Sequence, residues 1–143
     1  MSTAPPFVHR LEVRFRDCDA MGHTNNAVYL TYLEQARFAH WRSLWGFGTP
    51  QRPAGMPGVI LARIEADYKR QSRYGDILDV RLTVAELGRT SFKYEYEIVD
   101  AEGRTILTAK SVQVMYDYAT EKPVPIPGDI RALLTAAPDR SRS

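Results

Sequence analysis

Cysteine is almost absent from this chain of 143 residues, which contains Cys18 alone. A single cysteine excludes an internal disulfide and every zinc site built on cysteine pairs, and it fits a reducing compartment. No apolar run approaches the roughly 20 residues that cross a bilayer. The first residues, Met-Ser-Thr-Ala-Pro-Pro, lack the basic start and apolar centre of a secretion signal. We therefore expect a cytoplasmic protein that does not enter a membrane.

The chain also has no large excess of positive or of negative charge. There are 19 Lys and Arg residues against 17 Asp and Glu, a formal net charge of +2, and no basic run is interleaved with aromatics. We therefore expect no nucleic-acid partner. The apolar fraction of 44% and the charged fraction of 25% are close to globular averages. Residues 1–143 are predicted to form a single domain, with about 136–143 as a frayed tail.

The first half of the chain predicts one strand and one long helix. Between Phe7 and Phe15 the odd-numbered positions are mostly apolar, and they alternate with mostly polar ones. This is the period of a strand with one buried face. His9 shares the buried parity and is interpreted as structural, because no partner stands near it. A helix is predicted over Asn26–Trp45, and the glycines at 46 and 48 end it. Its apolar residues recur at helical spacing: Tyr29, Tyr32, Leu33, Ala36, Ala39 and Leu44.

The second half predicts four antiparallel strands joined by turns. Turn signals at 74–76 and 100–103 separate alternating stretches at about 59–68, 78–84, 92–98 and 104–116. The last strand changes parity between Leu107 and Val112, which predicts a bulge. Prolines at 123, 125 and 127 argue against regular structure before a short helix at about 129–135.

Five strands with one apolar face each need a cover, and the chain offers one long helix for that purpose. The predicted fold is therefore α+β, a five-stranded antiparallel sheet wrapped around one long central helix. Such a sheet leaves an edge strand without a partner. Because proteins commonly pair or cover such edges, we expect a homodimer whose sheet continues across the interface.

The segment between the first strand and the helix is the densest in polar side chains. Asp17 and Asp19 have the same parity, Gly22 permits a sharp turn, and Asn25 or Asn26 can cap the helix. The first helical turn presents unpaired N–H groups and the positive end of its dipole to this loop. A carboxylate beside such donors is half of a hydrolytic site, because the donors stabilise an oxyanion while the carboxylate attacks or activates water.

Two other interpretations of this loop stay open at this stage. In the first, Asp17, Asp19 and Asn25 are turn formers and caps without a chemical role. In the second, Asp17-Cys-Asp19 is the metal-binding D-x-D motif of a phosphohydrolase or glycosyltransferase. The rest of the chain has no βαβ alternation to build a parallel sheet, which argues against the second. Cys18 has no histidine placed to activate it and is assigned no role.

The run Asp17-Cys-Asp-Ala-Met-Gly-His-Thr-Asn-Asn-Ala-Val-Tyr29, followed by Tyr32-Leu-Glu-Gln-Ala-Arg37, resembles the signature of the 4-hydroxybenzoyl-CoA thioesterase-like branch of the hotdog superfamily. The likeness continues in Asp67-Tyr-Lys-Arg70, Tyr74-Gly-Asp76 and Pro125-Ile-Pro127. It implies a hotdog fold and an acyl-CoA thioesterase that uses no metal and no other cofactor. It also implies a homodimer, commonly a dimer of dimers, with active sites built from two chains.

On this resemblance Asp19 is the catalytic carboxylate, and the backbone N–H of Asn26 polarises the thioester carbonyl. A thioester needs no general acid, because its leaving thiolate has an intrinsic pKa of about 8.5 by analogy with cysteine. His23 and Asn25 belong to the same loop and are expected to contact the substrate or to shape the loop.

The phosphates of CoA need cations at the mouth of a pocket rather than a basic protein. Candidate positions are a strand end, with Lys69, Arg70 and Arg73, and the turn Arg89-Thr90-Ser91. The resemblance favours the turn. The sequence leaves open the acyl group and the choice between CoA and an acyl-carrier protein. Two other functions also stay open: a hotdog hydratase or dehydratase, which needs a catalytic histidine where Asp19 stands, and a non-catalytic acyl-CoA-binding module.

Overall fold

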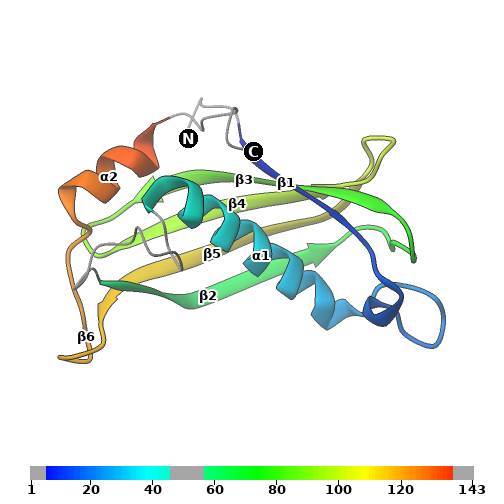
Figure 1. Cartoon of the computed structure of the whole chain (residues 1–143), viewed down its shortest axis with the longest axis horizontal. Helices are drawn as coiled ribbons and strands as arrows, with labels where there is room; N and C mark the ends of the chain where they lie inside the picture. Colours follow the sequence, from blue (N-terminus) through cyan, green and yellow to red (C-terminus); the bar gives the residue numbers. More distant parts are fainter. Residues whose placement is uncertain (1–5, 46–56, 137–143) are drawn as a thin grey trace.

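The computed structural model describes residues 6–45 and 57–136. Its elements are, in chain order, β1 (Phe7–Glu12), the 3-10 helix η1 (Phe15–Asp17), α1 (Asn26–Trp45), β2 (Gly58–Tyr68), β3 (Ile77–Leu87), β4 (Ser91–Val99), β5 (Thr105–Asp117), β6 (Lys122–Pro123) and α2 (Gly128–Thr135). Strands β1 to β5 form one antiparallel sheet in the order β1-β3-β4-β5-β2, and β6 pairs with β5. Helix α1 lies across one face of this sheet (Figure 1), which confirms the predicted fold.

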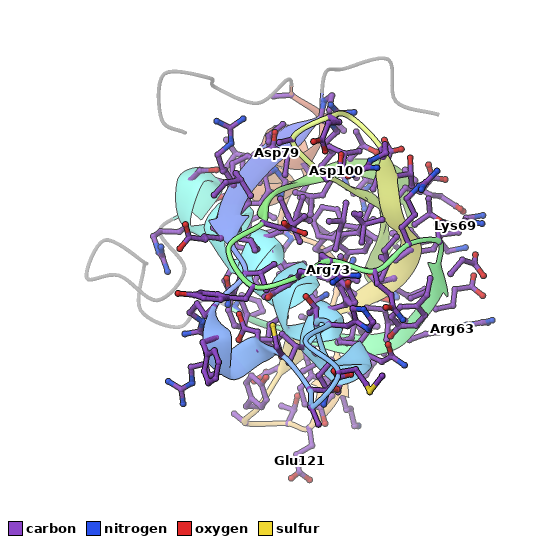
Figure 2. The ribbon with its side chains drawn as sticks, turned by 90° about the vertical axis from the view of Figure 1, so that its right-hand side faces the viewer. Arg63, Lys69, Arg73, Asp79, Asp100 and Glu121 are labelled. Atoms are coloured by element: carbon purple, nitrogen blue, oxygen red, sulfur yellow. The ribbon has the colours of Figure 1, made fainter. Side chains whose placement is uncertain are left out.

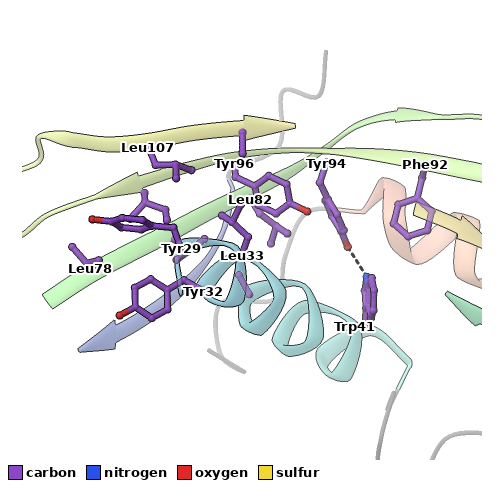
Figure 3. Packing of buried hydrophobic residues seen from close by; sticks show 14 of the residues in the cluster. Tyr29, Tyr32, Leu33, Trp41, Leu78, Leu82, Phe92, Tyr94, Tyr96 and Leu107 are labelled. Atoms are coloured by element: carbon purple, nitrogen blue, oxygen red, sulfur yellow. Dashed lines mark hydrogen bonds between the residues drawn. The ribbon is translucent and has the colours of Figure 1, made fainter. Parts of the chain in front are cut away.

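The core lies between α1 and the inner face of the sheet. Buried residues of α1 recur at spacings of three and four, as the helical pattern predicted, and they meet alternate residues of β3, β4 and β5. Figure 3 shows this packing and the hydrogen bond that Trp41 donates to the hydroxyl of Tyr94 at 3.0 Å. The largest fully buried side chains are Tyr29, Tyr32, Tyr94, Phe92, Leu33, Leu78, Leu82, Ile98, Ile106, Leu107, Met115 and Ile130.

The first strand is shorter than the sequence predicted. It ends at Glu12 rather than at Phe15, and η1 follows it. The carboxylate of Asp17 draws the chain into this turn, because its Oδ2 accepts the N–H of Arg14 at 2.9 Å. Val13 is buried, as the alternation required, but the side chain of Phe15 is 79% exposed. The placement of Phe15 on the buried face was therefore wrong.

Strand β2 pairs only with β5 among the described strands and forms one edge of the sheet. Its predicted apolar face is poorly covered within the chain, since Ile64 is half-buried and Tyr68 is 47% exposed. Leu61 is also 43% exposed, and a register shift between Leu61 and Arg63 places a bulge in this strand. An edge of 11 residues with exposed apolar side chains is the surface on which the predicted dimer would form.

The predicted parity change in the last strand is wrong. The register of β5 with β4 runs without a shift across 107–114, so that Ser111 and Gln113 are buried and the valines beside them lie on the outer face. Hydrogen bonds make these buried polar side chains tolerable. The hydroxyl of Ser111 bonds to that of Tyr96 and to Oε1 of Gln113, whose Nε2 donates to the carbonyl of Phe92 at 3.2 Å.

The C-terminal part of the described chain contains the predicted short helix, but Pro123 lies in a strand that was not predicted. Helix α2 buries Ile130 and Leu134 against the core. Pro123, expected outside regular structure, lies in the two-residue strand β6, at an edge position that tolerates proline. The glycines at 46 and 48 and the tail 137–143 lie outside the described residues. No described helix is long and apolar enough to cross a membrane.

Candidate active site

The loop between η1 and α1 folds as a small hairpin. The carbonyl of Asp17 accepts the N–H of Asn25 at 2.9 Å, and the carbonyl of His23 accepts the N–H of Asp19 at 2.8 Å. Gly22 closes the turn with a φ of 80°, in the left-handed region that favours glycine. The hairpin places Asp19 opposite His23 and leads directly into the first turn of α1.

Asp17 is the structural carboxylate of this hairpin. Its buried Oδ2 accepts the hydroxyl of Tyr32 at 2.8 Å, and the guanidinium of Arg14 donates to both carboxylate oxygens at 3.1 and 3.3 Å. Burial by itself raises the pKa of Asp17, but hydrogen bonds from Arg14 and Tyr32 outweigh it and hold this pKa below its usual value. These contacts fit a role for Asp17 in shaping the turn.

Asp19 is exposed and is oriented by the backbone of its own loop. Its Oδ1 accepts the N–H of Met21 at 2.9 Å and that of His23 at 3.2 Å. Among the described residues no donor is bonded to Oδ2 of Asp19. The carboxylate therefore has one oxygen that fixes its direction and one that is available to a substrate or to a water.

The first residue of α1, Asn26, supplies a backbone N–H donor a few positions after Asp19 in the sequence. Asn25 caps the helix, because its Oδ1 accepts the N–H of Ala27 at 2.9 Å and its carbonyl accepts that of Val28 at 2.9 Å. The N–H of Asn26 has no acceptor among the described residues. Tyr68 donates its hydroxyl to the carbonyl of Asn26 at 3.0 Å. The first helical residue is thus held by its carbonyl, while its N–H is one of the unpaired donors that every helix start presents.

Three buried hydroxyl groups fasten the hairpin to the segment before β3. The Oγ1 of Thr24 lies 2.6 Å from the Oγ of Ser72, and the hydroxyl of Tyr29 lies 2.7 Å from the same Oγ. The backbone N–H of Thr24 also donates to the carbonyl of Ser72 at 2.8 Å. Sequence reasoning missed this cluster, because its members stand 43 and 48 positions apart and no local pattern links them.

His23 and Cys18 lie in the hairpin without a side-chain partner that would activate them. The imidazole of His23 is half-buried and forms no hydrogen bond with another described residue, while the backbone of His23 bridges to that of Arg73. Cys18 packs partly against the core, with its Sγ 3.7 Å from the carbonyl of Arg14. His23 lies opposite Asp19 in the hairpin, and Asn25 and Asn26 follow where the hairpin enters α1.

The predicted phosphate-binding residues fall into two groups. Arg70 follows β2 at the end of the sheet where α1 begins, and its N–H donates to the carbonyl of Ile106 at 3.1 Å. The turn Arg89-Thr90-Ser91 joins β3 to β4 at the opposite end (Figure 1). Strand β3 separates the two ends by 11 residues, about 35 Å at the usual rise of a strand. Within one chain this turn cannot reach Asp19.

The candidate site is open on the surface of the single chain. Figure 2 looks onto this end of the molecule, where Asp19, Asn25 and Asn26 are all exposed. A cavity of about 760 Å³ lies between β1 and the second half of α1, and another of about 480 Å³ lies over β2, β4 and β5; neither includes the hairpin. The described residues contain no group of three or more His, Cys, Asp and Glu side chains that could hold a metal ion.

Comparison with known proteins identifies the family. Residues 13–134 match the model of the thioesterase-like superfamily. An Aquifex aeolicus protein described provisionally as an esterase is 31% identical over 129 residues, which are 90% of this chain and 98% of that protein. The long-chain acyl-CoA thioesterase FadM of Escherichia coli is 27% identical over 127 residues, which are 87% of this chain and 94% of FadM.

A solved structure shares the fold and about a third of the aligned residues. The crystal structure of a Thermus thermophilus thioesterase complexed with coenzyme A and Zn matches with a TM-score of 0.78 and 32% identity, over 92% of this chain and 99% of that chain. The segment matched by the family model contains the hairpin, α1 and strands β2 to β6. This chain therefore belongs to the thioesterase-like superfamily and has its hotdog fold.

Proposed function

We propose that this chain hydrolyses an acyl-CoA thioester to the free acid and CoA, with Asp19 and the N–H of Asn26 as its catalytic groups. Two features of the hairpin and the helix start that follows it carry the proposal: an exposed carboxylate oriented by the backbone, and a helix N–H with no acceptor among the residues that the structure describes. The names of FadM and of the Thermus thermophilus structure support thioester hydrolysis as the reaction type.

In this mechanism the thioester carbonyl oxygen accepts the N–H of Asn26. The donor and the helix dipole stabilise the negative charge that develops there as the carbonyl carbon becomes tetrahedral. Asp19 acts on the same carbon as nucleophile or as general base. As nucleophile it forms a mixed anhydride, which water then splits. As general base it takes a proton from the water that attacks the carbonyl directly.

Both routes consume one water and release CoA as a thiolate, which takes its proton from solvent. No general acid is needed, because a thiolate leaves far more easily than an alkoxide. The half-buried imidazole of His23 agrees with that, since no described residue forms a hydrogen bond that would orient it as an acid. A single turnover in ¹⁸O water identifies an anhydride that water opens at the Asp19 carbon, because only that route puts label into the carboxylate of Asp19. Label in the product acid alone is the result of the general-base route and also of an anhydride that water opens at the acyl carbon.

On this proposal a second copy of the chain completes the site. Two β2 edges that pair antiparallel about a two-fold axis place opposite ends of the two chains side by side. The turn Arg89-Thr90-Ser91 of the partner then approaches the end that carries Asp19, and it supplies cations for the CoA phosphates together with Arg70. The partner also supplies the walls that an open site lacks. Two such homodimers associate as a dimer of dimers, in the cytoplasm that the cysteine content predicts.

A thiol-release assay with aliphatic and aromatic acyl-CoAs of several chain lengths tests the proposed function and identifies the acyl group. We expect release of free thiol in equal amount to the acid formed. A hydratase or dehydratase would convert enoyl or hydroxyacyl thioesters without releasing thiol, and a binding module would retain acyl-CoA without turnover. Either of these two results would replace the thioesterase with the corresponding alternative.

A further inference from the structure

The cavity of about 760 Å³ lies at the edge of the sheet opposite to β2. Strand β1 forms that edge in the order β1-β3-β4-β5-β2 (Figure 1), and the cavity lies between β1 and the second half of α1. Ala39 lines it and follows Asn26 by 13 residues in α1, which is about 20 Å along the helix. The cavity is therefore separate from the candidate active site, and a dimer formed through β2 leaves it accessible.

One part of the cavity wall is apolar. The half-buried ring of Phe7 lines it and packs on the ring of His40, with centroids 5.0 Å apart. Val8, which is 38% exposed, and Ala39 of the helix complete this part of the wall. The volume falls in the range of about 300–1,000 Å³ that is usual for small-molecule sites. The cavity can therefore cover the apolar body of a small ligand.

The charged side chains of the cavity wall do not cancel one another. Arg10 and Asp79 form a compensated pair, because the guanidinium donates to both carboxylate oxygens at 2.8 and 3.1 Å. Arg42, on the last turn of α1, forms no ion pair with another described residue. One positive charge of the wall is therefore left without a partner.

His9 lies on the same wall and is half-buried. Burial lowers the pKa of His9 more than a side-chain contact with Gln35 raises it, and the charge of Arg42 lowers this pKa further. A neutral imidazole has one nitrogen that donates a hydrogen bond and one that accepts. Arg42 and His9 thus present one cation and one neutral polar group beside the apolar part of the wall.

We propose that this cavity binds an apolar monocarboxylate, whose carboxylate pairs with Arg42 beside His9 and whose hydrocarbon body lies on Phe7. A guanidinium binds a carboxylate through two parallel hydrogen bonds. A phosphate group fits this wall less well, because its charge of about −1.5 to −2 exceeds the single positive charge available. The acid released in the proposed reaction belongs to the same chemical class, but the inference does not rest on that reaction.

Calorimetric titration of the whole protein with octanoate, in the absence of any thioester, tests the proposal. We expect one octanoate to bind per chain with a Kd of about 1 mM or tighter. Octanamide has the same body without the charge, acetate has the charge without the body, and inorganic phosphate offers the other kind of anion. Each of these three should bind at least about tenfold more weakly than octanoate.

Two variants of the cavity wall and one control locate the binding. Arg42→Gln removes the unpaired cation, and Val8→Glu places a carboxylate where the hydrocarbon body lies. In each variant we expect the Kd for octanoate to rise at least about tenfold. Arg16→Gln is the matched control, because Arg16 is an exposed arginine of η1 that also forms no ion pair with another described residue. It should bind octanoate as the unmodified protein does.

Nuclear magnetic resonance of the imidazole protons provides a second readout. A carboxylate bound at Arg42 should raise the pKa of His9, because a nearby negative charge favours the protonated ring. The signals of His23, in the catalytic hairpin, should stay unchanged. The variant His9→Gln assigns the His9 signals.

Each other outcome overturns the proposal. Octanoate that moves the signals of His23 and not those of His9 would lie at the candidate active site. Unchanged affinity in Arg42→Gln, with a lower melting temperature, would leave Arg42 as a cation that stabilises the last turn of α1. Octanamide that binds as tightly as octanoate would make the cavity a purely apolar site, and phosphate that does so would make it a phosphate site.

The last alternative is that a second copy of this chain occupies the cavity. Light scattering would then show a smaller assembly for Val8→Glu than for the unmodified protein, and octanoate would not bind. None of these titrations uses a thioester or measures thiol release. Failure of the inference therefore leaves the proposed function standing, and failure of the thiol-release assay leaves the inference standing.

Discussion

The hydroxyl oxygen of Tyr29 lies 2.7 Å from the hydroxyl oxygen of Ser72, although 43 positions separate the two residues. The Oγ of Ser72 also lies 2.6 Å from Oγ1 of Thr24. One buried serine thus joins the first turns of α1, the hairpin that carries Asp19 and the segment before β3. On this account the position of the catalytic carboxylate depends on a side chain that takes no part in the chemistry.

Removal of that hydroxyl in Ser72→Ala should lower both stability and turnover. Two buried hydroxyl groups lose a partner, which costs about 1–3 kcal/mol in the free energy of unfolding. We expect kcat to fall more than KM rises, because the loosened hairpin holds Asp19 less firmly. Thermal unfolding and the thiol-release assay measure the two effects. Ser43→Ala is the control, since the Ser43 hydroxyl donates to the carbonyl of His40 within α1 and lies far from the hairpin. A kcat for Ser72→Ala equal to that of the unmodified protein would show that the Ser72 hydroxyl does not position Asp19.

Much of the fold could be predicted from the sequence because its periodicity is local. Helix α1 spans Asn26–Trp45 as predicted, and β3 and β4 bury the alternate residues that the pattern marked. The errors arose where hydrogen bonds overrode hydrophobicity. Ser111 is buried because the hydroxyl of Tyr96 and the amide of Gln113 satisfy it, and Phe15 is exposed because the carboxylate of Asp17 turns the chain before it.

The candidate site was predictable only where its parts are neighbours in the chain. Asp19, Asn25 and Asn26 stand in one short segment whose turn and cap residues carry their own local signals. Ser72 escaped prediction because its contacts to this segment depend on the packing of the whole sheet. The relation of Arg89 to Asp19 could not be read from one chain at all, since the two lie at opposite ends of it.

His40 should make the protein sensitive to acid. Burial lowers the pKa of His40 from 6.5 to about 4, and the ring Nδ1 lies 2.5 Å from the hydroxyl of Tyr94, which already accepts a hydrogen bond from Trp41. In the unfolded chain His40 takes up its proton near pH 6.5, so the free energy of unfolding falls as the pH drops toward 4, by about 3 kcal/mol in total. Denaturant titrations across this range should show a shallower loss in His40→Gln. Equal acid sensitivity in the variant would assign the effect to other groups.

Charge reversal at Arg89 should weaken the binding of CoA thioesters alone. In Arg89→Glu we expect a higher KM for acyl-CoA, an effect that shrinks as salt is added, with kcat nearly unchanged. Acyl-pantetheine should be hydrolysed as before, because it lacks the nucleotide phosphates. Arg81→Glu serves as control, because Arg81 is an exposed cation on β3 that already pairs with Glu97 at 3.5 Å. Equal losses for both substrates of Arg89→Glu would show that the nucleotide binds elsewhere.

A proline in the edge strand should disturb assembly and activity together. In Arg63→Pro the N–H at the middle of β2 is lost, which weakens pairing along this strand. We expect light scattering to show a smaller species across a dilution series and the thiol-release assay to show a parallel loss. Arg63→Ala keeps the N–H and removes only an exposed ion pair with Glu65, a change of about 0–1 kcal/mol. A well-folded monomer with full activity would refute a site shared between two chains.

The central claim is that the carboxylate of Asp19 carries the chemistry, and the most direct test is the turnover of Asp19→Asn on the best acyl-CoA of the panel. The amide keeps an oxygen that can accept the N–H groups of Met21 and His23, so the hairpin should fold as before. Asp117→Asn is a matched control, because Oδ1 of Asp117 likewise accepts the N–H two residues ahead, at 2.9 Å. We expect Asp19→Asn to lose about 10²–10⁴ in kcat with an unchanged melting temperature, and Asp117→Asn to lose none. A kcat for Asp19→Asn equal to that of the unmodified protein would contradict the account.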